Sequence, residues 1–193
     1  ILSAFHDQLS NERYLTFNPG VIVGGTEIEY DPAQNAGEVF GKTNVVAQMV
    51  KVQGGLLTLS RAQELSARGR MQAITTHDNL PQTSARIRFN DGYPPMAPTT
   101  GNLTLLKMLN QASEDLGYGS VEAYDPGLRG AADVSFVAEH VDAIDGIGAE
   151  GRGAHALNEQ IDLSTLPLLI ERAALLMYRI SRLDAWPKKR HSS

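Results

Sequence analysis

The sequence contains no cysteine and only one tryptophan among its 193 residues. The lack of cysteine excludes disulfide bonds and thiolate zinc sites, while it leaves the compartment, cytoplasmic or periplasmic, undetermined. The formal net charge is −5 and the basic residues are scattered, so no basic surface for nucleic acid is expected. No apolar run has the length of a membrane span and no signal peptide opens the chain, so we expect no membrane partner.

What the chain does contain suits a soluble globular protein with many turns. Hydrophobic residues make up 42% of it, with 18 glycines and 9 prolines. Its first residues, "ILSAFHDQL", show a helical apolar pattern with no capping residue before them, which indicates an upstream segment. The proline cluster "YPPMAPTTGN" marks the clearest boundary. We therefore expect domains over 1–93 and 94–185, followed by a flexible tail over 186–193.

The segments before this boundary alternate between helix and strand patterns. Val, Ile, Tyr and Phe dominate 14–25, which an Asn-Pro-Gly turn interrupts. Ala85, Ile87 and Phe89 alternate with polar residues, as in an amphipathic strand. The expected elements are a helix over 1–10, strands over 14–25, 44–60 (bent at Gly54–Gly55) and 83–93, a loop over 31–43, and a helix over 61–77.

The segments after the boundary are richer in helix. Leu105, Leu109, Ala112 and Leu116 recur at helical spacing, and Gly117 supplies a stop. We expect short strands over 121–125 and 141–148 and a helix over 130–140. Ser164 is expected to cap the strongest helix, whose apolar stripe comprises Leu166, Leu169, Ile170, Ala173, Ala174, Met177 and Ile180. The pattern predicts an α/β fold whose second half is short of strands for a complete sheet.

Three stretches, taken in order, resemble one enzyme family. They are "FGKTNVVAQMVKVQGGLLTLS" (40–60), "RGAADVSFVAEHVDAIDGIG" (129–148) and "GRGAHALNEQIDLSTLPLLIERAALLMYRI" (151–180). "GYPPM" (92–96) also fits a crossing between two domains. Together they are similar to the zinc-dependent amidohydrolases that include bacterial glutamate carboxypeptidase, acetylornithine deacetylase and succinyl-diaminopimelate desuccinylase. The resemblance is strongest to the glutamate carboxypeptidase branch.

This resemblance implies a catalytic α/β domain interrupted by a smaller α+β lid through which two subunits pair. It implies two zinc ions and hydrolysis of an amide bond in a small peptide or an N-acyl amino acid. The chain aligns with the end of the lid and the second half of the catalytic domain. The family's Glu-Glu pair is absent, so we expect the catalytic base upstream and no catalytic residue here. Activity would then require the missing N-terminal half, and partners would be that half or a second copy.

Four residues match positions that the family uses. His155 matches the last metal ligand, and the alternative is a surface-loop histidine. Asn44 matches a lid asparagine that contacts the substrate or the transition state, and the alternative is a turn residue before a strand. Gly130 and Ala131 match a loop whose backbone N–H groups face the substrate, and the same small residues also suit a tight helix start.

Other positions depart from the family or suit structural roles. Leu57 stands where the family has an arginine that grips the substrate carboxylate, and Arg61 or Arg88 are the candidates to replace it. Asp133 suits a cap or a loop organiser, and Glu159 suits a loop-to-helix junction. The His-x-Asp spelled by residues 140–142 lies where the family has a core strand, so we interpret it as structural. The competing hypothesis is a degenerate relative that acts only as a dimerisation or binding module.

Overall fold

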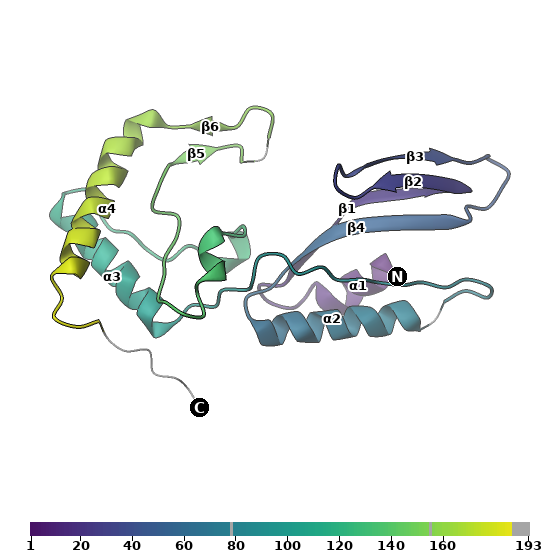
Figure 1. Cartoon of the computed structure of the whole chain (residues 1–193), viewed down its shortest axis with the longest axis horizontal. Helices are drawn as coiled ribbons and strands as arrows, with labels where there is room; N and C mark the ends of the chain where they lie inside the picture. The colour runs from purple at the N-terminus through teal and green to yellow at the C-terminus, as the bar shows by residue number, and fades with distance from the viewer. Residues whose placement is uncertain (78, 155, 187–193) are drawn as a thin grey trace. The chain divides into compact units, whose positions relative to one another are not determined.

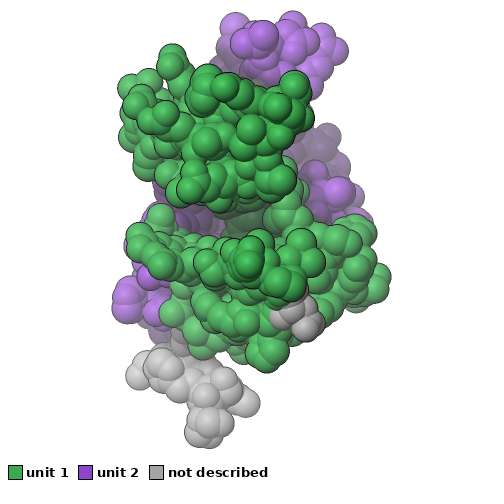
Figure 2. Space-filling model, turned by 90° about the vertical axis from the view of Figure 1, so that its right-hand side faces the viewer, with its two compact units in different colours: residues 1–90 green, residues 91–193 purple. Residues whose placement is uncertain are grey.

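The computed structural model describes residues 1–77, 79–154 and 156–186 (Figure 1). The chain divides into two compact units, Ile1–Asn90 and Asp91–Ser193, which are coloured separately in Figure 2. The fold mixes helices with short antiparallel strands, which is consistent with the predicted α/β class. No helix among the described residues is long and apolar enough to cross a membrane.

The first unit is built around two helices, α1 (Leu2–Leu9) and α2 (Arg61–Thr76), both as predicted. Ser60 begins α2 as a side-chain cap, because its hydroxyl accepts a hydrogen bond from the Gln63 N–H at 3.2 Å. The two helices bury a small apolar cluster that consists of Phe5, Leu9, Leu15, Ala67 and Met71. Leu9 and Ala67 are fully buried, so this cluster is the core of the unit.

A two-stranded antiparallel sheet pairs β1 (Thr16–Gly25) with β4 (Met49–Leu57). The register shifts between Pro19 and Val21, where the Asn-Pro-Gly signal predicted an interruption. A bulge suits this site because proline has no N–H to donate to the partner strand. Residues 44–48, predicted as the start of a strand, form a turn in which the Val45 N–H donates to the Lys42 carbonyl at 3.1 Å.

The prediction of a loop over 31–43 was only partly right, because residues 36–40 form a strand while 32–35 and 41–43 do not. The structure places a hairpin there, with β2 (Glu27–Asp31) paired to β3 (Ala36–Phe40). Its register sets Glu29 opposite Glu38, so one face of the hairpin is acidic and the segment lacks the apolar run by which strands are recognised. The Tyr30 hydroxyl donates to Gln53 Oε1 at 2.5 Å, which links the hairpin to β4.

The predicted strand over 83–93 is only half right. Ala85, Ile87 and Phe89 are half-buried while Arg86 and Arg88 are exposed, so the amphipathic alternation is real. Ile87 and Phe89 pack against the core of the first unit. The segment nevertheless forms no ladder with another strand of the described chain. Side-chain periodicity indicates which face is buried, and it carries no information on the backbone partner.

The second unit centres on α3 (Thr100–Asp115) and α4 (Leu166–Ser181), which lie side by side (Figure 1). The predicted stop after α3 is confirmed, since Gly117 adopts a φ of 78°. The buried apolar side chains of the two helices are Leu105, Leu109, Ala112, Leu169 and Leu176. Two polar pairs join the helix ends, namely Arg179 with Asp115 and the Tyr118 hydroxyl with the Glu171 carboxylate.

Two predictions about α4 need correction. Ser164 is not its cap, because Thr165 holds that position, and the Thr165 side chain accepts no hydrogen bond from the first turn of the helix. Ser164 lies in a short 3₁₀ turn, Leu163–Thr165, where its N–H donates to Asp162 Oδ1 at 2.9 Å. The predicted stripe was also too wide, since Ile170 and Met177 are each 64% exposed. The apolar stripe of α4 is therefore wider than the part of it that is buried.

Three further predictions in the second unit were wrong. Residues 121–125 and 141–148 form no strand, and the helix expected over 130–140 is reduced to the 3₁₀ turn η2, Asp133–Phe136. The other elements are the 3₁₀ turn η1, Pro126–Leu128, and a hairpin of β5 (Gly151–Arg152) with β6 (Gln160–Ile161). A short apolar segment becomes a strand only where another strand pairs with it, and the described residues supply no such partner here.

Candidate functional site

The segment 129–136 presents the two small residues that were predicted to face a substrate. Gly130 and Ala131 are both exposed, and the backbone on either side is extended at Arg129 (φ −72°, ψ 155°) and Ala132 (φ −143°, ψ 143°). A Cβ built on Gly130 meets no atom within 4 Å, and the φ of Gly130 is not positive. The fold itself therefore does not require glycine at this position.

Contacts at both ends hold this segment. The Arg129 guanidinium donates to the Pro126 carbonyl, and burial lowers the pKa of Arg129. At the other end, Asp133 begins η2, and its Oδ1 accepts a hydrogen bond from the Tyr93 hydroxyl at 2.9 Å. Asp133 is therefore not the cap of η2, a position that Ala132 holds, and it organises the loop through Tyr93 instead. Its partner Tyr93 was not predicted, because nothing in "GYPPM" signals a contact 40 residues away.

Asn44 lies in the first unit, in the exposed turn that leads into β4. Its position agrees with the interpretation as a turn residue before a strand and does not test a contact with substrate. Gly130 and Ala131 belong to the second unit. Of the predicted substrate-binding residues, only the adjacent pair therefore shares a unit.

The predicted metal ligand, His155, lies outside the described residues. The hairpin of β5 and β6 flanks this position, and two backbone hydrogen bonds shape the connection between the strands. The Ala156 N–H donates to the Gly153 carbonyl at 2.9 Å, and the Glu159 N–H donates to the Ala156 carbonyl at 3.1 Å. Gly153 has a φ of 71°, which favours glycine at the start of the turn.

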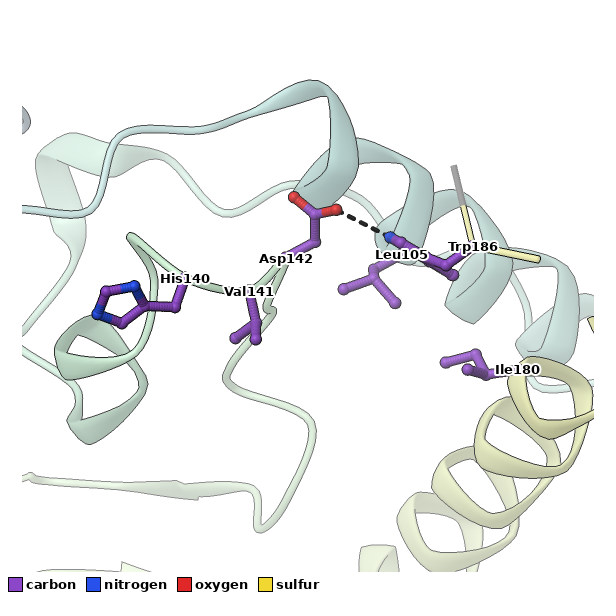
Figure 3. A pocket seen from close by; sticks show the side chains of 6 residues that line it. All are labelled: Leu105, His140, Val141, Asp142, Ile180 and Trp186. Carbon is purple, nitrogen blue, oxygen red and sulfur yellow. Dashed lines mark hydrogen bonds between the residues drawn. The ribbon is translucent and has the colours of Figure 1, made fainter. Parts of the chain in front are cut away.

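The His-x-Asp sequence does not form a joint site. Asp142 accepts hydrogen bonds from Trp186 Nε1 at 2.9 Å and from the Thr99 hydroxyl at 3.4 Å. Figure 3 shows the His140 imidazole pointing away from this carboxylate. His140, Asp142 and Trp186 line a pocket of about 400 Å³ together with Leu105, Val141 and Ile180. Both carboxylate oxygens of Asp142 are engaged with the protein, as its structural interpretation implies.

The candidate replacements for the family arginine have other surroundings. Leu57 ends β4, is half-buried and pairs with Thr16. Arg61 forms an ion pair with Glu64 at 2.6 Å within the first turn of α2. Arg88 is exposed on the extended segment 83–93. All three positions belong to the first unit, as Asn44 does.

The described residues do not fit a zinc site by themselves. Across 1–77, 79–154 and 156–186, no three His, Asp or Glu side chains are grouped so that they can hold a metal ion. A catalytic zinc takes about three protein ligands and leaves one position open. The described residues alone therefore supply no such zinc site.

The comparison with known families assigns the chain to a class of hydrolases. The sequence profile described as Peptidase family M20/M25/M40 matches residues 8–179. The match spans nearly all of the 193 residues, so the chain belongs to this family. Family membership implies a metallopeptidase-type hydrolase, and members are typically zinc-dependent. A search of curated proteins found no match.

Proposed function

We propose that this chain is the C-terminal portion of a di-zinc amidohydrolase that cleaves an amide bond in an N-acyl amino acid or at the C-terminus of a small peptide. The observation that carries the proposal is the family match over 8–179, together with the order of the motifs around positions 44, 130 and 155. In this proposal, residues 1–93 belong to the lid and residues 94–185 to the catalytic domain.

The roles of the chain's own residues follow from their chemistry. The His155 imidazole would contribute one zinc ligand. The exposed backbone N–H groups at Gly130 and Ala131 would bind the substrate, and the Asn44 amide would donate to or accept from it. The catalytic base and the remaining ligands would come from the N-terminal half of the enzyme. We derive no step through zinc, because the described residues do not form its site.

The experiment combines the chain with a polypeptide that supplies the missing ligands, covalently or in trans. Native mass spectrometry with zinc quantification is expected to show about two zinc ions per assembly. Release of amino acid from a panel of N-acetyl amino acids and dipeptides would then be measured. His155→Ala should lose zinc and hydrolysis, while His140→Ala should keep both because His140 is exposed and points away from Asp142. A folded assembly without hydrolysis would refute the proposal.

A second candidate is a dimerisation or binding module without activity. The exposed apolar pair Ile22 and Val52, opposite each other on β1 and β4, favours it. This surface is suited to a second copy of the chain. Analytical ultracentrifugation of the chain alone decides this point, since a zinc-free homodimer supports the module and a monomer argues against it.

A further inference from the structure

Tyr93 connects the start of the second unit to the exposed segment around Gly130. Its hydroxyl donates to Asp133 Oδ1 at 2.9 Å, and its ring lies 5.2 Å from the ring of Phe136 at an interplanar angle of 52°. Both contacts are with residues of η2, which Ala132 separates from the exposed residues Gly130 and Ala131. One side chain thus contacts the first and the last residue of this turn.

The chemistry of the pair favours a persistent tether. The Tyr93 phenol is protonated at neutral pH and donates to Asp133, and this hydrogen bond, followed by the charge of the carboxylate, raises the pKa of Tyr93. A hydrogen bond to a charged acceptor is stronger than one between neutral groups. The tilted contact with Phe136 adds a second attachment at the other end of the turn.

The Arg129 guanidinium contacts the opposite end of the segment 129–136, where it donates to the Pro126 carbonyl, three positions earlier in the chain. That contact is local, whereas Tyr93 is distant in sequence. Tyr93 therefore ties the residues that follow Gly130 and Ala131 to a distant part of the same unit.

We propose that Tyr93 is a positioning residue, which holds η2 so that the backbone N–H groups at Gly130 and Ala131 meet the substrate in one orientation. This rests on the proposed function, because it assumes that these groups bind substrate. Tyr93 acts through Asp133 and Phe136 and takes no part in the reaction itself.

The chain offers a matched control for this proposal. The Tyr118 hydroxyl also donates to a carboxylate, that of Glu171, in the same unit. Its pKa is likewise raised, first by that hydrogen bond. Tyr118 joins α3 to α4 and has no contact with η2 that the structure records. Replacing either tyrosine with phenylalanine removes one phenol–carboxylate hydrogen bond and retains the ring.

The experiment uses the active assembly of the proposed function and its best N-acetyl amino acid substrate. Tyr93→Phe is expected to raise KM about tenfold, the effect of one charge-assisted hydrogen bond on binding, with kcat within about twofold of wild type. Tyr118→Phe is expected to leave both constants unchanged. Hydrogen–deuterium exchange of amides 130–136 should quicken in Tyr93→Phe alone. Asp133→Asn keeps an acceptor oxygen, so its KM should lie between that of wild type and that of Asp133→Ala.

The outcomes separate this inference from the function on which it rests. A wild-type assembly that neither binds nor hydrolyses the substrate refutes the proposed function, and the positioning role with it. An active wild type whose KM is unaffected by Tyr93→Phe refutes the positioning role alone. The positioning role alone is also refuted if Tyr118→Phe raises KM as much as Tyr93→Phe does. It is likewise refuted if Tyr93→Phe leaves hydrogen–deuterium exchange at 130–136 unaltered.

Discussion

The carboxylate of Asp142 occupies the place where a side chain on residue 101 would lie. A Cβ built on Gly101 would overlap the carboxyl group of Asp142. That carboxylate also accepts hydrogen bonds from Thr99, which caps α3, and from Trp186. A negative charge in the first turn of a helix is favourable, so Asp142 stabilises the start of α3 as it joins three segments of the unit.

Gly101→Ala is therefore expected to destabilise the protein by about 1 kcal/mol, because the Asp142 carboxylate must move and give up its hydrogen bonds to Thr99 and Trp186. This sign is opposite to the ordinary benefit of alanine over glycine in a helix. Gly69→Ala is the matched control, because Gly69 lies inside α2 and a Cβ there meets nothing within 4 Å. Gly69→Ala should raise the free energy of unfolding by about 0.5–1 kcal/mol. Urea denaturation of wild type and both variants gives the two changes in the free energy of unfolding.

A double substitution tests the cause of this effect. In an Asp142→Ala background, the carboxyl group that a Cβ at position 101 would overlap is gone. Gly101→Ala should then be neutral or stabilising. A destabilisation of the same size in both backgrounds would show that the clash with Asp142 is not the reason.

Gly130→Ala is expected to leave stability unchanged or to raise it by about 0.4–1 kcal/mol, through the lower entropy of the unfolded chain. The space around a Cβ at Gly130 is open. In the active assembly the same change should raise KM, because the methyl group separates the backbone from the substrate. Gly148→Ala, also in open space, should leave KM unaltered. Equal kinetics for both variants would remove Gly130 from the substrate site.

The ion pair between Asp115 and Arg179 should make stability depend on pH at the acidic end. The hydrogen bond from Arg179, and then that from Gln111, lowers the pKa of Asp115. A carboxyl whose pKa is lower in the folded state contributes stability above its unfolded pKa, about 3.9, and loses it as pH falls through the folded value. The Tm of wild type and of Asp115→Asn should therefore differ at neutral pH and converge below about pH 4.

Arg179→Gln checks the partner in this pair. It should reproduce the Tm profile of Asp115→Asn, and the double variant should add little to either. A wild-type profile that stays parallel to that of Asp115→Asn down to acid pH would contradict the assignment. Because Asp115 is exposed, the effect should also shrink in high salt.

Two buried serine hydroxyls are expected to be destabilising. Ser113 is 0% exposed and Ser135 is 5% exposed, and neither Oγ has a hydrogen-bond partner among the described residues. Burial of an unpaired hydroxyl costs free energy, so Ser113→Ala and Ser135→Ala should each stabilise by about 1 kcal/mol. Ser181→Ala serves as control, since its exposed hydroxyl donates to the Tyr178 carbonyl at 2.7 Å. A loss of stability would reveal a partner for the buried group.

Helices were largely predictable from the sequence because their evidence is local. Ser60 and Thr99 each accept from the N–H three residues on, and Gly117 follows α3. Strands depend on distant partners, so the segments 121–125 and 141–148 failed although their composition favoured strand. The hairpin over 27–40 was missed because its strands do find each other as partners, while one face of it is polar and gives no apolar strand pattern.

The candidate site shows the same division between local and distant information. Motif matching found Gly130 and Ala131, which the structure leaves exposed, and it assigned Asp133 a structural role. It could not find Tyr93, because a contact between residues 40 positions apart depends on the fold. The predicted roles of Asn44 and His155 depend on partners beyond the described residues, so they stay predictions.

The apolar stripe of α4 has a consequence for the rotation of that helix about its own axis. Leu169 and Leu176 lie on the buried side, while Ile170 and Met177 lie about 100° further around the helix and are exposed. The stripe thus continues past the buried side chains, so apolar burial alone fixes the rotation of α4 only loosely. The pairs Arg179–Asp115 and Tyr118–Glu171 attach two positions of α4 to the end of α3 and to a residue shortly beyond it, and so limit that rotation.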